Sequence, residues 1–241
     1  MCHISLSANT VLCVFGILTT LANPLAEGSA VSVPAPVQET ALAASATTSG
    51  RSPPGQPIPA ATLRGTLRAE SEVPLSEMVI YLESSDPSRR FPRPAQPARI
   101  SQEGARFSPA LLIVPVGQTV EFPNDEKRPI EHNVFSNAPA KRFDLGLFRP
   151  GETRSVSFDK PGPVFLYCSI HRYMDGVIYV APTPYFSRVG PGGSYQIADI
   201  PAGTWALKTW QRRKRFPELT VLLNLTPGQP FVQDLELKRK Q

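Results

Sequence analysis

A cysteine, a histidine and a methionine follow one another at equal spacing in the second half of the chain. Cys168, His171 and Met174 form the pattern Cys-x-x-His-x-x-Met at the exit of the apolar, strand-like run 164–168. A second histidine, His132, lies upstream, at the end of another predicted strand and loop. One thiolate, two imidazoles and one thioether are the donors of a trigonal copper site with a weak axial Met. Because this mixture of donors suits both Cu(I) and Cu(II), the four residues predict a copper centre for one-electron transfer.

The other cysteines and the third histidine strengthen this prediction. Cys2, His3 and Cys13 all lie within residues 1–30, which we predict to be a secretory signal peptide because their apolar core, 11–22, is too short to span a bilayer. Removal of this segment leaves a single Cys and two His, all three in the predicted site. A lone thiol held by a metal suits the periplasm or another exported location. The alternative is a buried cysteine that only fills core space.

The charge of the chain favours an acidic partner. The net charge is +5, and removal of residues 1–30 takes away one acid, Glu27, and no base, which gives +6. The one basic run, 212–215, is predicted to be a solvated loop between strands, and no basic–aromatic pattern supports nucleic-acid binding. No apolar segment is long enough to predict an integral membrane span.

The organisation of the chain predicts an all-β protein. Residues 31–61 are rich in Pro, Ala, Ser and Thr and form a predicted disordered tether. Beyond the tether, short apolar runs alternate with Gly and Pro turns, which is typical of β-sandwiches. The predicted strands are 63–68, 78–83, 110–116, 119–122, 154–158, 164–168, 176–180, 194–200, 204–210, 219–225 and 231–237.

Several segments in the centre of the chain resemble the cupredoxins. They are residues 115–124, 132–136, 149–158, 161–162 and 167–176. The spacing of the last three donors is similar to that of amicyanin and shorter than that of plastocyanin and pseudoazurin. The resemblance implies a Greek-key sandwich over residues 96–182 that binds one mononuclear type 1 (blue) copper. The implied ligands are His132, Cys168, His171 and Met174. Asn133 matches a plastocyanin Asn whose hydrogen bonds join the two ligand loops.

The same resemblance implies that His171 is the exposed ligand and the electron port. Amicyanin has Pro on both sides of this histidine, where this chain has Ile170 and Arg172, so a positive charge adjoins the port. The basic pair 141–142 would lie nearby if its loop folds toward the same end. Because small electron-transfer interfaces are weak and often steered by charge, we expect a redox partner with an acidic surface, a cytochrome or a dehydrogenase. The alternative is that Arg172 only pairs with Asp175.

A second resemblance covers the two ends of the folded part. Residues 185–207 resemble the latter part of a carboxypeptidase-regulatory-like, or transthyretin-like, β-sandwich, and residues 64–82 resemble its first two strands. Neither piece has enough strands to be stable alone. We therefore expect the hairpin and loop 62–95 to pair with the C-terminal sandwich 183–241, with the copper domain 96–182 inserted between them. This order is similar to that of bacterial proteins described as methylamine utilization or plastocyanin-like proteins.

The predicted ligand set favours an electron carrier over an enzyme. Four protein donors leave no open position for a substrate. Thioether is a poor zinc ligand, and the second Cys of a CuA centre and the Cys-x-x-Cys-His of a c-type haem are both absent from the loop. Three alternatives remain: a copper buffer, an interaction module with a structural metal, and an accessory subunit of a periplasmic dehydrogenase.

Overall fold

The computed structural model describes residues 60–70 and 74–239, so the predicted signal peptide and nearly all of the predicted tether lie outside it. The described chain is all-β, which confirms the predicted fold class. Apart from strands it contains two short 3-10 turns, η1 (Leu75–Glu77) and η2 (Pro191–Gly193). No helix of this part has the length and apolar character needed to cross a membrane.

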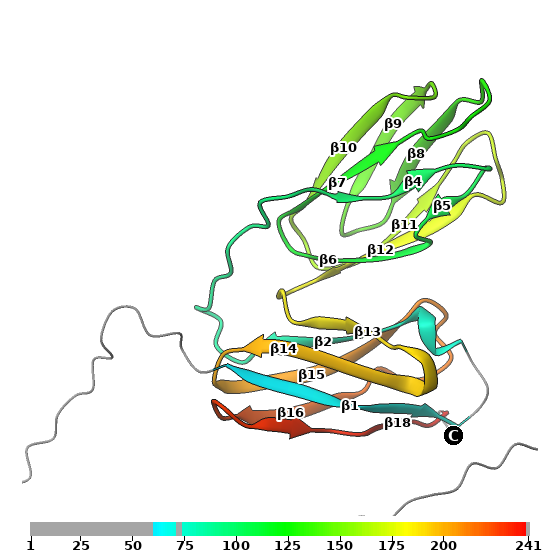
Figure 1. The fold of residues 1–241 in the computed structure, drawn as a ribbon. Helices are drawn as coiled ribbons and strands as arrows, with labels where there is room; N and C mark the ends of the chain where they lie inside the picture. Colours follow the sequence, from blue (N-terminus) through cyan, green and yellow to red (C-terminus); the bar gives the residue numbers. More distant parts are fainter. Residues whose placement is uncertain (1–59, 71–73, 240–241) are drawn as a thin grey trace, which may run out of the picture. The chain divides into compact units, whose positions relative to one another are not determined.

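Strands β3 to β12 form one β-sandwich, which we call the inserted sandwich (green to yellow in Figure 1). One of its sheets has the order β10-β7-β3 and the other β6-β12-β11-β8-β9, while β4 pairs with β5. The strands are β3 (Ala98–Arg99), β4 (Ser101–Gln102), β5 (Phe107–Ser108), β6 (Leu111–Pro115), β7 (Gln118–Pro123), β8 (His132–Asn137), β9 (Arg142–Phe148), β10 (Thr153–Phe158), β11 (Gly162–Tyr167) and β12 (Asp175–Ala181).

Strands from both ends of the described chain form a second β-sandwich, which we call the flanking sandwich. β1 (Ala61–Ala69) runs antiparallel to β14 and parallel to β17 and β18, and Figure 1 shows cyan β1 beside red β18. β2 (Met78–Ser84) lies between β13 and β15 in the other sheet. The first two strands therefore contribute one strand to each sheet. The remaining strands are β13 (Phe186–Arg188), β14 (Ser194–Ile200), β15 (Gly203–Gln211), β16 (Thr220–Leu225), β17 (Pro230–Val232) and β18 (Leu235–Leu237).

Each sandwich has its own apolar core. Phe122 and Leu166 are fully buried in the inserted sandwich, and Leu63 and Trp205 are fully buried in the flanking one. Alternation along the strands produces this burial, because every second side chain of a strand points to the same face. A third, smaller buried cluster contains side chains from β2, β6, β12 and β15.

Two strands beside the predicted site differ from the sequence-based expectation. His132 begins strand β8 rather than following a strand, and neither β8 nor β9 was among the predicted strands. β8 buries His132, Asn133 and Ser136 as well as apolar residues, so polar side chains interrupt its alternation. β9 is the edge strand of its sheet and is mostly exposed. Periodicity of apolar residues could not find either strand for these reasons.

Candidate metal centre

Two neighbouring strands bring the predicted ligands together. β11 runs antiparallel to β8, with Tyr167 opposite Phe135. The loop that follows β11 therefore lies beside the start of β8, where His132 stands. Cys168 and His171 both lie in this loop, which ends at Met174 just before β12. Residues 36 and 39 positions apart in sequence thus become neighbours in space.

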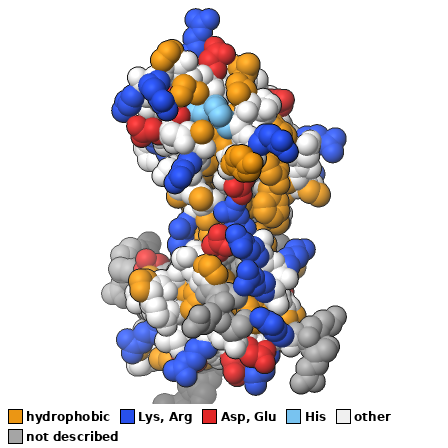
Figure 2. Space-filling model, turned by 90° about the vertical axis from the view of Figure 1, so that its right-hand side faces the viewer, with side chains coloured by type: hydrophobic (Ala, Val, Ile, Leu, Met, Phe, Trp, Pro, Cys, Tyr) orange, Lys and Arg blue, Asp and Glu red, His pale blue; other side chains and the backbone are white. Residues whose placement is uncertain are grey.

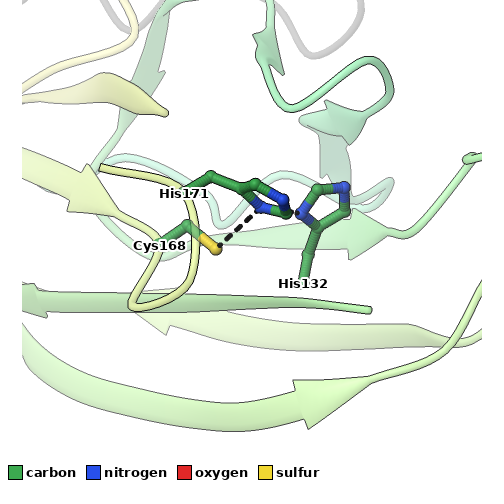
Figure 3. Close-up of side chains that lie close together, drawn as sticks. All are labelled: His132, Cys168 and His171. Atoms are coloured by element: carbon green, nitrogen blue, oxygen red, sulfur yellow. Dashed lines mark hydrogen bonds between the residues drawn. The ribbon is translucent and has the colours of Figure 1, made fainter. Parts of the chain in front are cut away.

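His132, Cys168 and His171 direct their donor atoms at one another (Figure 3). The Nδ1 atoms of the two histidines are 3.1 Å apart, and Cys168 Sγ is 3.8 Å from His171 Nδ1. All three donor atoms lie within 4.8 Å of one another. They form the one group of His, Cys, Asp and Glu side chains in the described chain with the spacing of a metal site.

The distances and the donor types fit a bound transition metal. Bonds from such an ion are about 2.0 Å to a His nitrogen and about 2.3 Å to a Cys sulfur. The separations of 3.1 and 3.8 Å are each shorter than the sum of the two bonds involved, so a single ion can reach both members of each pair. Cys168 is buried and is not in a disulfide. Thiolate and imidazole together suit copper.

Met174 lies on the inner side of the same loop. Its backbone N–H donates to the His171 carbonyl over 2.9 Å, which closes the loop into a turn. The Met174 side chain is 1% exposed and belongs to the same buried cluster as Cys168. The predicted thioether donor is therefore buried in the core beside Cys168. Arg172 and Tyr173, which lie between His171 and Met174 in the sequence, are exposed.

A buried carboxylate, which the sequence analysis missed, holds the far side of the His132 ring. Glu126 Oε1 lies 2.9 Å from His132 Nε2, and the two side chains are 4% and 0% exposed. Burial raises the pKa of Glu126, but hydrogen bonds from His132 and from the Ala105 amide outweigh burial, so the net pKa is lowered. An ionised carboxylate only accepts hydrogen bonds. His132 must therefore carry its proton on Nε2, which leaves the Nδ1 lone pair free to bind a metal.

The loop that carries Glu126 is fixed by Asn124. The Asn124 Nδ2 donates to the carbonyls of Ile130 and Phe148 over 3.0 and 3.1 Å. Its Oδ1 accepts the Glu126 N–H over 3.2 Å. The sequence signal for this arrangement was an acid six residues before the predicted ligand His132, inside a loop that begins with Asn and contains Pro129. Only the structure shows that this loop folds back and places the Glu126 carboxylate beside the His132 ring.

Asn133 links the two ligand segments. Its Oδ1 accepts the backbone N–H of Ser169 over 2.8 Å, and its Nδ2 donates to Asp144 over 2.7 Å. Ser169 directly follows Cys168, so this bond connects the strand of one predicted ligand to the loop of the others. Bonds of this kind fix the orientation of ligands.

The charged surroundings of His171 differ from those expected. Arg172 is exposed and forms no ion pair with any described residue, and Asp175 pairs with Arg212 instead. The basic pair 141–142 does not lie near the site, because His132 pairs with Phe148 and the opposite end of the hairpin pairs Asn137 with Arg142. This expectation was wrong because β8 carries the chain away from the site before the loop begins.

Part of the chain is similar to solved copper proteins, although no protein-family model matches it. A purple cupredoxin from Nitrosopumilus maritimus is 28% identical over 35% of this chain and 99% of its own, with a TM-score of 0.32. A reduced amicyanin variant is 20% identical over 36% and 84%, with a TM-score of 0.33. A copper-containing nitrite reductase from Thermus scotoductus SA-01 is 26% identical over 47% and 28%, with a TM-score of 0.35. Cupredoxins are thus among the structures similar to part of this chain, as the sequence resemblance predicted.

Proposed function

We propose that the protein is a mononuclear type 1 copper protein that carries single electrons between redox partners. The observation that supports this most is the convergence of His132 Nδ1, Cys168 Sγ and His171 Nδ1 within 4.8 Å. We propose these three residues as the main ligands and Met174 as the axial ligand. Copper in such a site supplies a reversible one-electron couple.

The residues around the site each have a part in this proposal. Glu126 keeps the His132 proton on Nε2, so that Nδ1 stays available. Asn133 holds the loop of Cys168 at a fixed distance from β8. The apolar cluster that contains Cys168 and Met174 keeps water from the buried side. Because these contacts join protein groups to one another, we expect them to persist in both oxidation states, so that the ligands need little rearrangement during electron transfer.

The donor set also supports a carrier rather than an enzyme. Four protein donors leave no position for a substrate to bind the metal. We propose export to the periplasm from the predicted signal peptide, and a redox protein with an acidic surface as the partner, with His171 and Arg172 at the port.

A visible spectrum tests the proposal directly. The purified protein with one equivalent of Cu(II) should show an intense thiolate-to-copper charge-transfer band and should cycle reversibly between Cu(II) and Cu(I). Cys168→Ser should abolish the band and keep the far-ultraviolet circular dichroism of the fold. Ser169→Ala, in the adjacent position, is the matched control and should retain the band. A chain that binds zinc but stays colourless with Cu(II) contradicts the proposal, and one that binds copper without cycling is a buffer.

A further inference from the structure

A groove of about 810 Å³ lies at the surface of the inserted sandwich and includes His171 in its wall. Three segments line the groove: the loop 127–131 that leads into β8, residues 149–150 after β9, and residues 170–171 of the ligand loop. In Figure 2 the pale blue His side chain reaches the surface among orange hydrophobic and blue basic side chains. The groove therefore adjoins His171, which is the less buried of the two predicted histidine ligands.

The charged side chains of the groove are mostly basic. Lys127, Arg128 and Arg149 line it together with one acid, Glu131. Arg149 pairs with Glu131 over 3.4 Å and Lys127 with Glu103 over 4.0 Å, but both bases are about four-fifths exposed, at 79% and 82%, so these pairs are weak. Arg128 is exposed and forms no ion pair or side-chain hydrogen bond with a described residue.

The fold brings these bases to the port. Phe148 pairs with His132 across β8 and β9, and Arg149 is the next residue. Arg128 lies on the loop that Asn124 holds through the Ile130 carbonyl. The Ile130 N–H also donates to the Arg128 carbonyl over 2.7 Å, which makes a tight turn. Arg149 therefore directly follows the strand that pairs with β8, and Arg128 stands on a loop that is held by Asn124.

The rest of the groove wall is apolar. Pro129, Ile130, Pro150 and Ile170 line it, and Ile170 is 49% exposed. A small anion has nothing to bury against such a wall. A protein segment can cover it with apolar atoms while its carboxylates face the arginines, and protein interfaces commonly combine an apolar centre with a polar rim in this way.

We propose that this groove docks a carboxylate-rich loop of the redox partner, with Arg128 and Arg149 as the residues that bind its acids. The proposal rests on the proposed electron-carrier function and assigns its docking surface. Contact at the groove places the partner against His171, so charge steering and electron transfer occur at the same place.

Nuclear magnetic resonance of the ¹⁵N-labelled full chain, metal-free and Cu(I)-loaded, tests the docking surface with a decapeptide of glutamate as the probe. The peptide should shift the backbone amides of Arg128 and Arg149 in both forms. Monomeric glutamate at the same carboxylate concentration should not. Equal shifts from the monomer would make the groove a small-anion site, and the absence of shifts, or shifts elsewhere, would also overturn the proposal.

Paired charge reversals separate the groove from net charge. Arg128→Glu with Arg149→Glu should weaken peptide binding about tenfold, and Arg128→Gln with Arg149→Gln should give an intermediate loss. Lys141→Glu with Arg142→Glu makes the same charge change at the far end of the β8–β9 hairpin and should leave binding within about twofold. Equal losses in both reversals would overturn the proposal.

In the copper-loaded protein the peptide should also slow reduction by hexacyanoferrate(II). A missing copper band in that assay contradicts only the electron-carrier function, because the peptide titration needs no metal.

Discussion

Both sandwiches bury polar side chains, but among the described residues only the inserted sandwich buries a histidine and a carboxylate. In the flanking sandwich the amide of Gln211 is satisfied by backbone groups: its Nε2 donates to the Phe216 carbonyl, and its Oε1 accepts the N–H groups of Arg215 and Phe216. These bonds hold a loop. In the inserted sandwich, buried His132 and Glu126 bond to each other through their side chains. A buried pair of titratable side chains is costly unless each satisfies the other, so such pairs indicate a functional site.

The same contrast provides separate spectroscopic probes. Both tryptophans of the chain, Trp205 and Trp210, lie on β15 of the flanking sandwich. All four predicted ligands lie in the inserted sandwich. Trp205 lies in the core of the flanking sandwich, but Trp210 stacks on Tyr179 of β12 in the third buried cluster. In a Trp210→Phe background, tryptophan fluorescence therefore reports the unfolding of the flanking sandwich, and the predicted copper band reports the inserted one.

The largest expected effect comes from removing a core leucine from each sandwich in turn. Leu63 and Leu166 are both 0% exposed. Leu63→Ala should lower the stability of the flanking sandwich, and Leu166→Ala that of the inserted sandwich, each by about 2–5 kcal/mol because a cavity remains. In denaturant titrations in the Trp210→Phe background, the first change should move the fluorescence transition, and the second the copper-band transition. If either substitution moves both transitions equally, the sandwiches unfold as one unit and the contrast fails.

A smaller effect is expected from the carboxylate behind His132. Glu126→Gln keeps the size of the side chain but removes its charge and lets the amide donate as well as accept, so the His132 tautomer is no longer fixed. Copper affinity should fall about 10- to 100-fold. Competition with a chelator of known affinity measures this loss. Glu121→Gln, on β7 and with no hydrogen bond or ion pair to His132, serves as the control for charge alone, and an unchanged affinity in the Glu126 variant contradicts the assigned role.

Sequence and fold contributed different parts of this site. The proposed donors Cys168, His171 and Met174 stand out in the sequence because they lie within one loop at fixed spacing, and His132 because the chain offers few other histidines. Glu126 was not predictable, since its contact depends on how the loop after Asn124 turns back. The position of a charge relative to the port depends on strand direction, which explains why Arg149 rather than the pair 141–142 lies there.

The all-β class followed from short apolar runs between turns, and most strands of the flanking sandwich followed from their alternation. Strand β9 could not be found in this way, because an exposed edge strand buries little on either face. Strand β8 was hidden because buried polar residues, among them the proposed ligand His132, interrupt its apolar alternation. The regions that sequence patterns describe least well are thus those next to the predicted ligands, where chemistry rather than packing selects the residues.

The smallest expected effect concerns Asp234, a carboxylate that links β1, the first strand of the flanking sandwich, to its C-terminal strands. Asp234 Oδ1 accepts hydrogen bonds from the Thr66 N–H and Oγ1, both over 2.8 Å. The hydrogen bond from the Thr66 side chain, followed by that from its backbone, lowers the pKa of Asp234 from its ordinary value of 3.8. A lowered pKa in the folded state stabilises the fold above about pH 3.8, and this contribution is lost as the pH falls through the lower, folded value.

Acid titration of the fluorescence transition measures this contribution. Between about pH 5 and 2 the midpoint of the unmodified protein should fall more steeply than that of Asp234→Asn, because the variant has no carboxylate to protonate. Thr66→Val removes the hydroxyl donor, and it should reduce the acid dependence in part, since the backbone N–H remains. The double variant should resemble Asp234→Asn, because the two residues act through one interaction.

The Asp234 carboxylate is exposed, so added salt should leave its two hydrogen bonds to Thr66 in place while weakening its longer-range attraction to Arg68. Parallel acid dependence in the unmodified protein and in Asp234→Asn would show that Asp234 does not tie β1 to the C-terminal strands.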